Sequence, residues 1–194
     1  YRPGYPPDLI TWIASRAPDR ALAVDCATGN GQAAIALAGH FDAVLAVDGS
    51  LAQLERAQPH PNVRYELAMA EQLPVPDQSV SLVAAAQAVH WFDFEGFHAE
   101  CRRVLKPGGV IAVWTYEKFQ AGSAIDGIVD RFYADVVGDY WPPERRYVDE
   151  AYQTLPFPWA EERAPGFQLV TEWSLEQALG YCASWSSVQR FKDE

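Results

Sequence analysis

Asp25 and Asp48 each end an apolar run, and Gly29 and Gly31 lie between them. The first run, residues 21–25, leads into the glycines, and residues 32–37 then have the pattern of a helix. A strand, a tight turn and a helix N-terminus in this order form the first unit of a nucleotide-binding α/β sheet. Glycines suit such a turn because a Cβ would hold a ligand away from the backbone and disfavour a positive φ. A carboxylate at the end of the second run, Asp48, is placed to accept both hydroxyls of a ribose.

Two ligand classes fit this turn. Gly29-Asn-Gly31-Gln-Ala-Ala34 satisfies the dinucleotide pattern G-x-G-x-x-G/A. The same stretch, read as Asp25-x-Ala27-x-Gly29-x-Gly31, resembles motif I of class I methyltransferases that use S-adenosylmethionine (SAM). Asp25 favours SAM, because a carboxylate repels a pyrophosphate but attracts the ammonium and sulfonium groups of SAM. The alternative role for Asp25 is that of a helix N-cap or turn residue.

Composition limits the classes of partner. The 194 residues suit one domain, and a net charge of −11 argues against a nucleic-acid surface. Three widely spaced cysteines without a CxxC pair predict reduced thiols, a cytoplasmic location and no structural zinc or other metal site. No apolar run approaches transmembrane length, so no membrane partner is expected. The chain begins with Tyr and stops after a helical pattern, and we expect processed or truncated ends.

Strand-like and helix-like segments alternate along the first part of the chain. Strands are predicted over residues 21–25, 43–48, 63–67, 80–89 and 110–114, and helices over 7–17, 32–37, 50–58 and 93–105. A Ser50–Gln53 capping box should start the third helix, and Asp93 should cap the fourth. This alternation implies an α/β fold with a mostly parallel sheet and helices on both faces. After residue 116 we predict a helix over 124–137, a sixth strand over 167–173 and a helix over 174–185. This Trp- and Pro-rich region is expected to cover the strand ends, where ligands bind in open α/β sheets.

Five segments, taken in order, strongly resemble the small-molecule SAM-dependent methyltransferases of the class I, Rossmann-like type. They are Val24-Asp-Cys-Ala-Thr-Gly-Asn-Gly31, Val47-Asp-Gly-Ser50, Ala70-Glu-Gln-Leu-Pro74, Ala86-Gln-Ala-Val-His-Trp91 and Arg103-Val-Leu-Lys-Pro-Gly-Gly109. A narrower resemblance, to the trans-aconitate methyltransferase-like branch, comes from Tyr1-Arg-Pro-Gly-Tyr-Pro6, the Gln-Ala-x-His-Trp segment and Trp141-Pro-Pro-Glu-Arg145. The resemblance implies a SAM-binding core over residues 1–116 and a helical, aromatic-rich cap over 117–194 in the same domain. It also implies a seven-stranded sheet, whose last strand would lie beyond Glu194.

The resemblance assigns a cofactor site residue by residue. Asp25 and the turn of Ala27, Thr28, Gly29 and Gly31 would face the methionine part of SAM. Asp48 would take the ribose hydroxyls, with Gly49 and Ser50 beside the adenine. Gln87 would lie near the methionine ammonium, and Tyr1 and Arg2 would close over the carboxylate end. Family members often carry an Asp that contacts the adenine amino group, and here that position is Met69. The Ala70 amide, Glu71 and apolar packing would then hold the base, and S-adenosylhomocysteine would be the product.

Methyl transfer from a sulfonium is an in-line displacement, so the protein must align the reactants and exclude water. His90 is the candidate general base if the nucleophile arrives protonated, and its alternative role is structural. The other histidines, His40, His60 and His98, are interpreted as incidental. Trp91, Tyr116, Trp141, Trp114 and Trp159 could line an acceptor pocket or simply pack on the sheet. Arg145 could bind an acceptor carboxylate, with Arg146, or remain a solvated surface residue.

The sequence therefore leaves three functions open. The first is a SAM-dependent methyltransferase acting on a small molecule, with a carboxylated or aromatic metabolite as the candidate acceptor and a monomer or homodimer as the assembly. The second is an NAD(P)-dependent oxidoreductase, which the glycine spacing permits and Asp25 disfavours. The third is a SAM-binding module without catalysis.

Overall fold

A five-stranded parallel sheet forms the centre of the chain in the computed structural model, which describes residues 3–194. Its strands are β1 (Leu22–Cys26), β2 (Ala43–Asp48), β3 (Val63–Leu67), β4 (Val80–Ala86) and β5 (Leu105–Trp114). They lie in the order β3-β2-β1-β4-β5, and every neighbouring pair is parallel. The order reverses between β1 and β4, and the carboxyl end of a sheet at such a point is where open α/β folds bind ligands.

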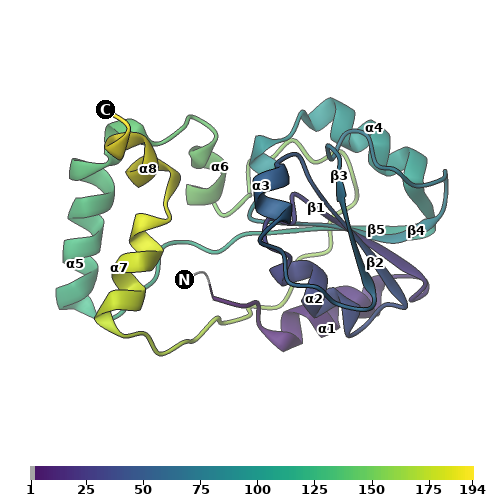
Figure 1. The fold of residues 1–194 in the computed structure, drawn as a ribbon, viewed down its shortest axis with the longest axis horizontal. Coiled ribbons are helices and arrows are strands. Elements are labelled where there is room, and N and C mark those ends of the chain that lie inside the picture. The colour runs from purple at the N-terminus through teal and green to yellow at the C-terminus, as the bar shows by residue number, and fades with distance from the viewer. Residues whose placement is uncertain (1–2) are drawn as a thin grey trace. The chain divides into compact units, whose positions relative to one another are not determined.

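Helices cover both faces of this sheet (Figure 1). On one face, α1 (Pro7–Arg16) and α2 (Gln32–Ala38) contribute Ile10, Ile13 and Leu37 to an apolar cluster with strand residues such as Ala46 and Leu82. Helix α4 (Phe94–Val104) lies on the opposite face in the figure and buries Phe97, Cys101 and Val104. A short α3 (Leu51–Leu54) follows β2, and a 3₁₀ turn, η1 (Val89–Trp91), follows β4. The predicted α/β class is confirmed.

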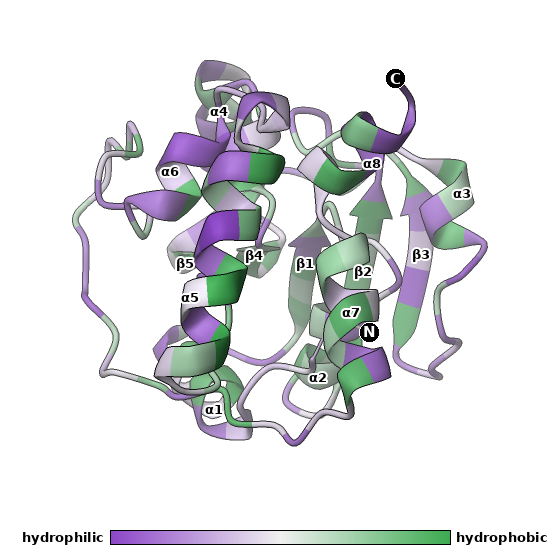
Figure 2. Ribbon diagram, turned by 90° about the vertical axis from the view of Figure 1, so that its left-hand side faces the viewer, coloured by the Kyte–Doolittle hydropathy of each residue, from purple (hydrophilic) through white to green (hydrophobic). Residues whose placement is uncertain are grey.

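The chain divides into two compact units. The core unit comprises Gly4–Thr115 and Leu155–Leu169, and the aromatic unit comprises Pro3, Tyr116–Thr154 and Val170–Glu194. The aromatic unit contains α5 (Ser123–Arg131) with a π turn, η2 (Phe132–Val136), a 3₁₀ turn, η3 (Gly138–Tyr140), α6 (Arg145–Asp149), α7 (Leu175–Ala183) and α8 (Ser186–Lys192). Aromatic and β-branched side chains form its core: Val129, Val137, Tyr181, Trp185 and Val188. Figure 2 shows hydrophobic and hydrophilic residues alternating along α5, as an amphipathic helix requires.

The sixth strand predicted over residues 167–173 is wrong, because no strand is present after β5 in the part of the chain that the structure describes. Phe167 packs instead against Trp12 of α1, with ring centroids 6.3 Å apart, and joins the apolar cluster beneath the sheet. Val170 is 84% exposed. Trp173, at the other end of the segment, packs on Tyr181, so the apolar residues of 167–173 pack against other side chains rather than form a strand.

Three smaller predictions also need correction. The helix after Ser50 has four residues and no side-chain cap; Ser50 is held instead through its N–H, which donates to Asp48. Asp93 precedes α4 but makes no side-chain capping bond either. The fourth strand ends at Ala86, since Gln87 has a φ of +57° and leaves the extended conformation. A complete capping box is found instead at Ser174 and Gln177, at the start of α7.

Within the described residues, no helix is long and apolar enough to cross a membrane. Tyr1 and Arg2, which the resemblance placed over the carboxylate end of the cofactor, lie outside the described residues.

Candidate functional site

The turn after β1 is held in a conformation that exposes its backbone. Ala27, Gly29 and Gly31 have φ values of +53°, +57° and +89°. The Thr28 N–H donates to the Val47 carbonyl of β2 (2.9 Å), and the Gly31 N–H donates to the Thr28 carbonyl (3.0 Å). A Cβ at Gly29 would meet no atom within 4 Å, so open space lies directly over the turn.

Asp25 lies buried beneath this turn, with 1% of its surface exposed. Its Oδ2 accepts a hydrogen bond from the Thr28 hydroxyl (2.5 Å), while Oδ1 has no partner among residues 3–194. Burial, with a smaller contribution from the nearby Asp48 carboxylate, raises the pKa of Asp25 to about 7, although hydrogen bonds from the Thr28 hydroxyl and the Ala34 backbone lower it. A cation placed near Asp25 would reverse this effect and favour the ionised carboxylate.

Asp48 ends β2 and ties the turn to the next loop. Its Oδ2 accepts from the Gly29 N–H and its Oδ1 from the Ser50 N–H, both at 2.8 Å. Each carboxylate oxygen can accept two hydrogen bonds, so both retain capacity for a ligand hydroxyl. The bonds hold the carboxylate in one orientation, which suits recognition of a diol.

Tyr65 is a part of the site that sequence reasoning missed. Its side chain comes from β3, and its hydroxyl donates to the Gln58 carbonyl (2.8 Å). The hydroxyl occupies the place where a Cβ on Gly31 would stand, so Gly31 is required for space as well as for its positive φ. No sequence pattern signalled this contact, because it depends on a strand that lies two places along the sheet.

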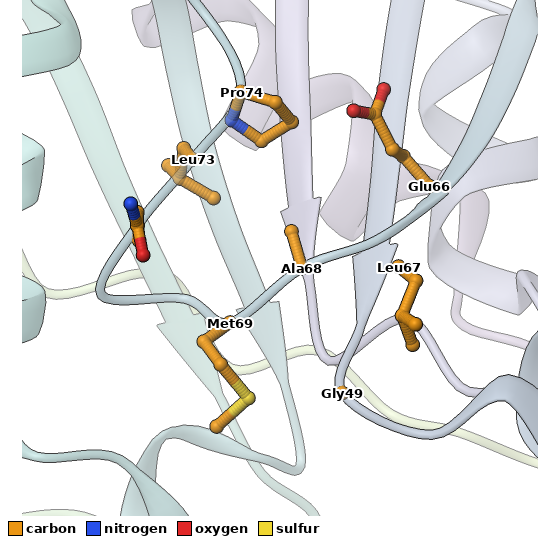
Figure 3. Close-up of a pocket in the computed structure, with 8 residues that line it drawn as sticks. Gly49, Glu66, Leu67, Ala68, Met69, Leu73 and Pro74 are labelled. Carbon is orange, nitrogen blue, oxygen red and sulfur yellow. The ribbon is translucent and has the colours of Figure 1, made fainter.

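A cavity of about 480 Å³ opens beyond Asp48, between the ends of β2 and β3 (Figure 3). Met69 and Gly49, both predicted beside the adenine, line it together with the neighbouring residues Glu66, Leu67, Ala68, Gln72, Leu73 and Pro74. Ala70 is buried, with 5% exposed. The Glu71 Oε1 accepts from the Asp93 N–H (2.9 Å), so this carboxylate fixes the start of α4.

Gln87 and His90 follow β4 on the same edge of the sheet. The Gln87 N–H donates to the Trp114 carbonyl (2.9 Å), and its Oε1 accepts from the Thr115 hydroxyl (3.0 Å). His90 is 6% exposed and lies against the ring of Trp91, with ring centroids 4.9 Å apart. Trp91 itself is 51% exposed, so its indole remains accessible to a ligand.

Three further acceptor candidates, Tyr116, Trp141 and Arg145, belong to the aromatic unit, and the last two lie together. The Arg145 guanidinium stacks on Trp141, 4.4 Å from the ring centroid, and its Nε donates to the Tyr133 hydroxyl (2.8 Å) and to Asp149 Oδ1 (3.2 Å). Arg145 is thus a partly buried, stacked side chain rather than a freely solvated one. Tyr116 packs on the apolar core of the same unit.

His98 is not incidental, contrary to the sequence interpretation. It is 4% exposed, its Nε2 lies 2.9 Å from the Pro156 carbonyl, and its Nδ1 accepts from the Trp159 indole N–H (3.0 Å). His98 and Trp159 together fasten the returning segment Leu155–Leu169 to α4, so Trp159 serves packing here. Among the described residues, no cluster of His, Cys, Asp and Glu could hold a metal ion.

Comparison with known proteins identifies what this arrangement resembles. The methyltransferase domain family matches residues 24–113, from the middle of β1 to the end of β5. A solved structure from Anaeromyxobacter dehalogenans, provisionally named a type II methyltransferase, is 43% identical, with a TM-score of 0.91 over 100% of this chain and 82% of that one. Another, from Anabaena variabilis, provisionally named a methyltransferase of an antibiotic biosynthesis pathway, is 26% identical, with a TM-score of 0.53 over 72% and 57% of the two chains.

Curated relatives have similar names. A Dictyostelium discoideum protein, provisionally named a methyltransferase, is 34% identical over 98% of this chain and 74% of its own length. An uncharacterized methyltransferase of Mycobacterium tuberculosis is 37% identical over 58% of this chain and 46% of its own length. The chain thus spans about three quarters of the first relative and about half of the second.

Proposed function

The chain belongs to the class I SAM-dependent methyltransferases, and we propose that it transfers a methyl group from SAM to a small-molecule acceptor. One observation carries the proposal. Asp48 is fixed by the Gly29 and Ser50 N–H groups beside a turn whose surface is open, and each of its oxygens can accept a further hydrogen bond. This is the geometry that a ribose diol requires, with room for the rest of a nucleoside on either side.

The charge of the site supports SAM over a dinucleotide. Asp25 is buried under the turn, and its Oδ1 has no partner among residues 3–194. A pyrophosphate placed here would meet this carboxyl group, whereas the cationic methionine end of SAM would favour its ionised form. When bound, SAM supplies an electrophilic methyl group on a sulfonium. The turn residues Ala27 and Gly29 would hold its methionine portion through their exposed backbone, and Gln87 would lie toward the ammonium.

The acceptor side of the reaction needs alignment more than it needs acid–base chemistry. His90 is buried at the carboxyl edge of the sheet and would take the proton of a neutral nucleophile. The exposed indole of Trp91 would provide an apolar surface next to it. A carboxylate or thiolate nucleophile would need no base, and His90 would then only position Trp91.

The narrower resemblance to the trans-aconitate branch implies an anionic acceptor, and we propose Arg145 as its contact. Trp141, Tyr133 and Asp149 orient the guanidinium through stacking and Nε hydrogen bonds. The Nε bonds leave the terminal NH₂ groups for a carboxylate, which Arg binds through paired hydrogen bonds. An aromatic acceptor that carries a carboxylate is the chemistry that fits Trp141 and Arg145 together.

Turnover tests this proposal. The protein is incubated with SAM and a panel of carboxylated and aromatic acceptors, and S-adenosylhomocysteine formation is measured. We expect acceptor-dependent product, which Asp48→Ala abolishes and Asp42→Ala leaves unchanged. Asp42 is the matched control because it is exposed and precedes the amino end of the same strand. Equal turnover by the two variants would show that Asp48 does not bind the cofactor.

A further inference from the structure

Met69, in the loop after β3, packs against Gly49, which follows Asp48 at the end of β2. Met69, the single methionine of the chain, lies over Gly49. Its Sδ is 2.8 Å from the point where a Cβ on residue 49 would stand. The thioether therefore takes space that any larger residue at position 49 would fill. Met69 nevertheless stays 60% exposed, so one side of it is free to meet a ligand.

The cavity next to Met69 has both polar and apolar walls. Leu67, Ala68, Leu73 and Pro74 contribute to it, and Figure 3 shows Met69 and Glu66 toward opposite ends. The Glu66 carboxylate points away from Met69 in this view and pairs with Arg64 at 3.1 Å. A flat base placed against Gly49 would thus contact a polarisable sulfur and aliphatic carbon, and thioether–aromatic contacts of this kind are favourable.

We propose that Met69 forms the packing surface for the cofactor's purine and that no carboxylate reads the purine 6-amino group. This inference rests on the proposed function, because it assumes that the nucleoside of SAM lies beside Asp48. As a consequence, the site is selective for the ribose hydroxyls, through Asp48, and has little selectivity for the substituent at position 6 of the purine. Purines that differ only at position 6 are then accepted as cofactors or product analogues.

The discriminating probe is S-adenosylhomocysteine that carries hydrogen in place of the 6-amino group. This change keeps the ring nitrogens as acceptors and removes only the amino donor. A hydrogen bond from this amino group to a carboxylate would be worth about tenfold or more in affinity. We therefore expect the dissociation constants of the two compounds, measured by calorimetry, to agree within about threefold.

Two variants sharpen the test. Met69→Leu keeps an apolar surface and should leave the ratio of the two dissociation constants unchanged. Met69→Asp places a carboxylate at the same position and should raise the preference for the 6-amino compound to about tenfold or more. A tenfold preference already present in the wild-type protein would overturn the inference while leaving the proposed function intact. Failure of S-adenosylhomocysteine itself to bind would overturn the proposed function and the inference together.

Discussion

Burial of the Asp25 carboxyl group links the stability of the protein to pH at the site itself. Burial raises the pKa of Asp25 from 3.8 to about 7 in the folded chain. The folded state therefore keeps a proton that the unfolded state has already lost. The resulting stabilisation is complete below the unfolded value, declines as the pH rises, and is lost once the pH passes the folded value.

Asp25→Asn should remove this dependence, because the amide does not ionise. We expect the melting temperature of the variant, relative to wild type, to rise between pH 5 and about pH 7 and then to level off, in the absence of ligand. The Asp42→Asn variant, a matched change at an exposed position, is the control. Melting curves of wild type and Asp25→Asn that shift in parallel with pH would contradict the account.

Gly31 should tolerate no side chain while Tyr65 is present. An alanine at position 31 must adopt a positive φ, at a cost of about 1–2 kcal/mol. It must also displace the Tyr65 hydroxyl, at a further cost of roughly 1–3 kcal/mol. In a Tyr65→Ala background the second cost disappears, so Gly31→Ala should become markedly less destabilising. Denaturant unfolding of the four proteins of this cycle measures the coupling, and additive effects would exclude the contact.

At the scale of elements, α4 holds the loop that forms one wall of the cavity beside Gly49 and Met69. Arg103 donates to the Leu73 and Val75 carbonyls, to both Glu100 oxygens and to Asp77. The Glu100 Oε1 also accepts from the Leu73 N–H (2.6 Å). The Arg103 guanidinium, with this N–H, holds the pKa of Glu100 below its ordinary value despite partial burial. Leu73 lines the cavity, so the network fixes one of its walls.

Arg103→Ala should therefore weaken both folding and ligand binding. Hydrogen bonds to charged groups contribute about 1.5–3 kcal/mol, and the variant leaves Glu100 without its main partner. Arg102→Ala is the neighbouring control, since Arg102 is exposed and its guanidinium stacks on the Trp159 ring. We expect a loss of about 2 kcal/mol in unfolding free energy for Arg103→Ala and under about 0.5 kcal/mol for Arg102→Ala. Equal losses would mean that the network does not hold the loop.

Elements with strong apolar runs were predictable, and elements defined by contacts were not. The strands that became β1 and β2 follow from their runs, because buried parallel strands are almost continuously apolar. The strand that became β3 follows instead from the alternation of apolar and polar residues over 63–67. Residues 167–173 also contain several apolar residues, but Phe167 and Trp173 pack into apolar clusters and the segment forms no strand. The end of β4 depends on the positive φ of Gln87. This could not be predicted, because glutamine rarely adopts a positive φ.

At the scale of the whole molecule, the core of the candidate site could be predicted because it is made of strand ends. Asp25 and Asp48 meet since β1 and β2 are adjacent and parallel, with Cys26 opposite Val47. The contacts of Tyr65 with Gly31 and of Met69 with Gly49 bring together segments that are distant in the chain. Spacing within one segment contains no information about such pairs. The roles of His90 and Arg145 toward an acceptor stay predictions.

The most direct test is a calorimetric titration of the protein with S-adenosylhomocysteine, with NAD as the comparison ligand. The product analogue does not turn over, so the isotherm reports the site itself. We expect one site per chain, with a dissociation constant in the micromolar range or below, lost in Asp48→Ala, and no heat with NAD. Binding of NAD in place of S-adenosylhomocysteine would contradict the account of Asp25, and binding of neither compound would contradict the proposed cofactor site.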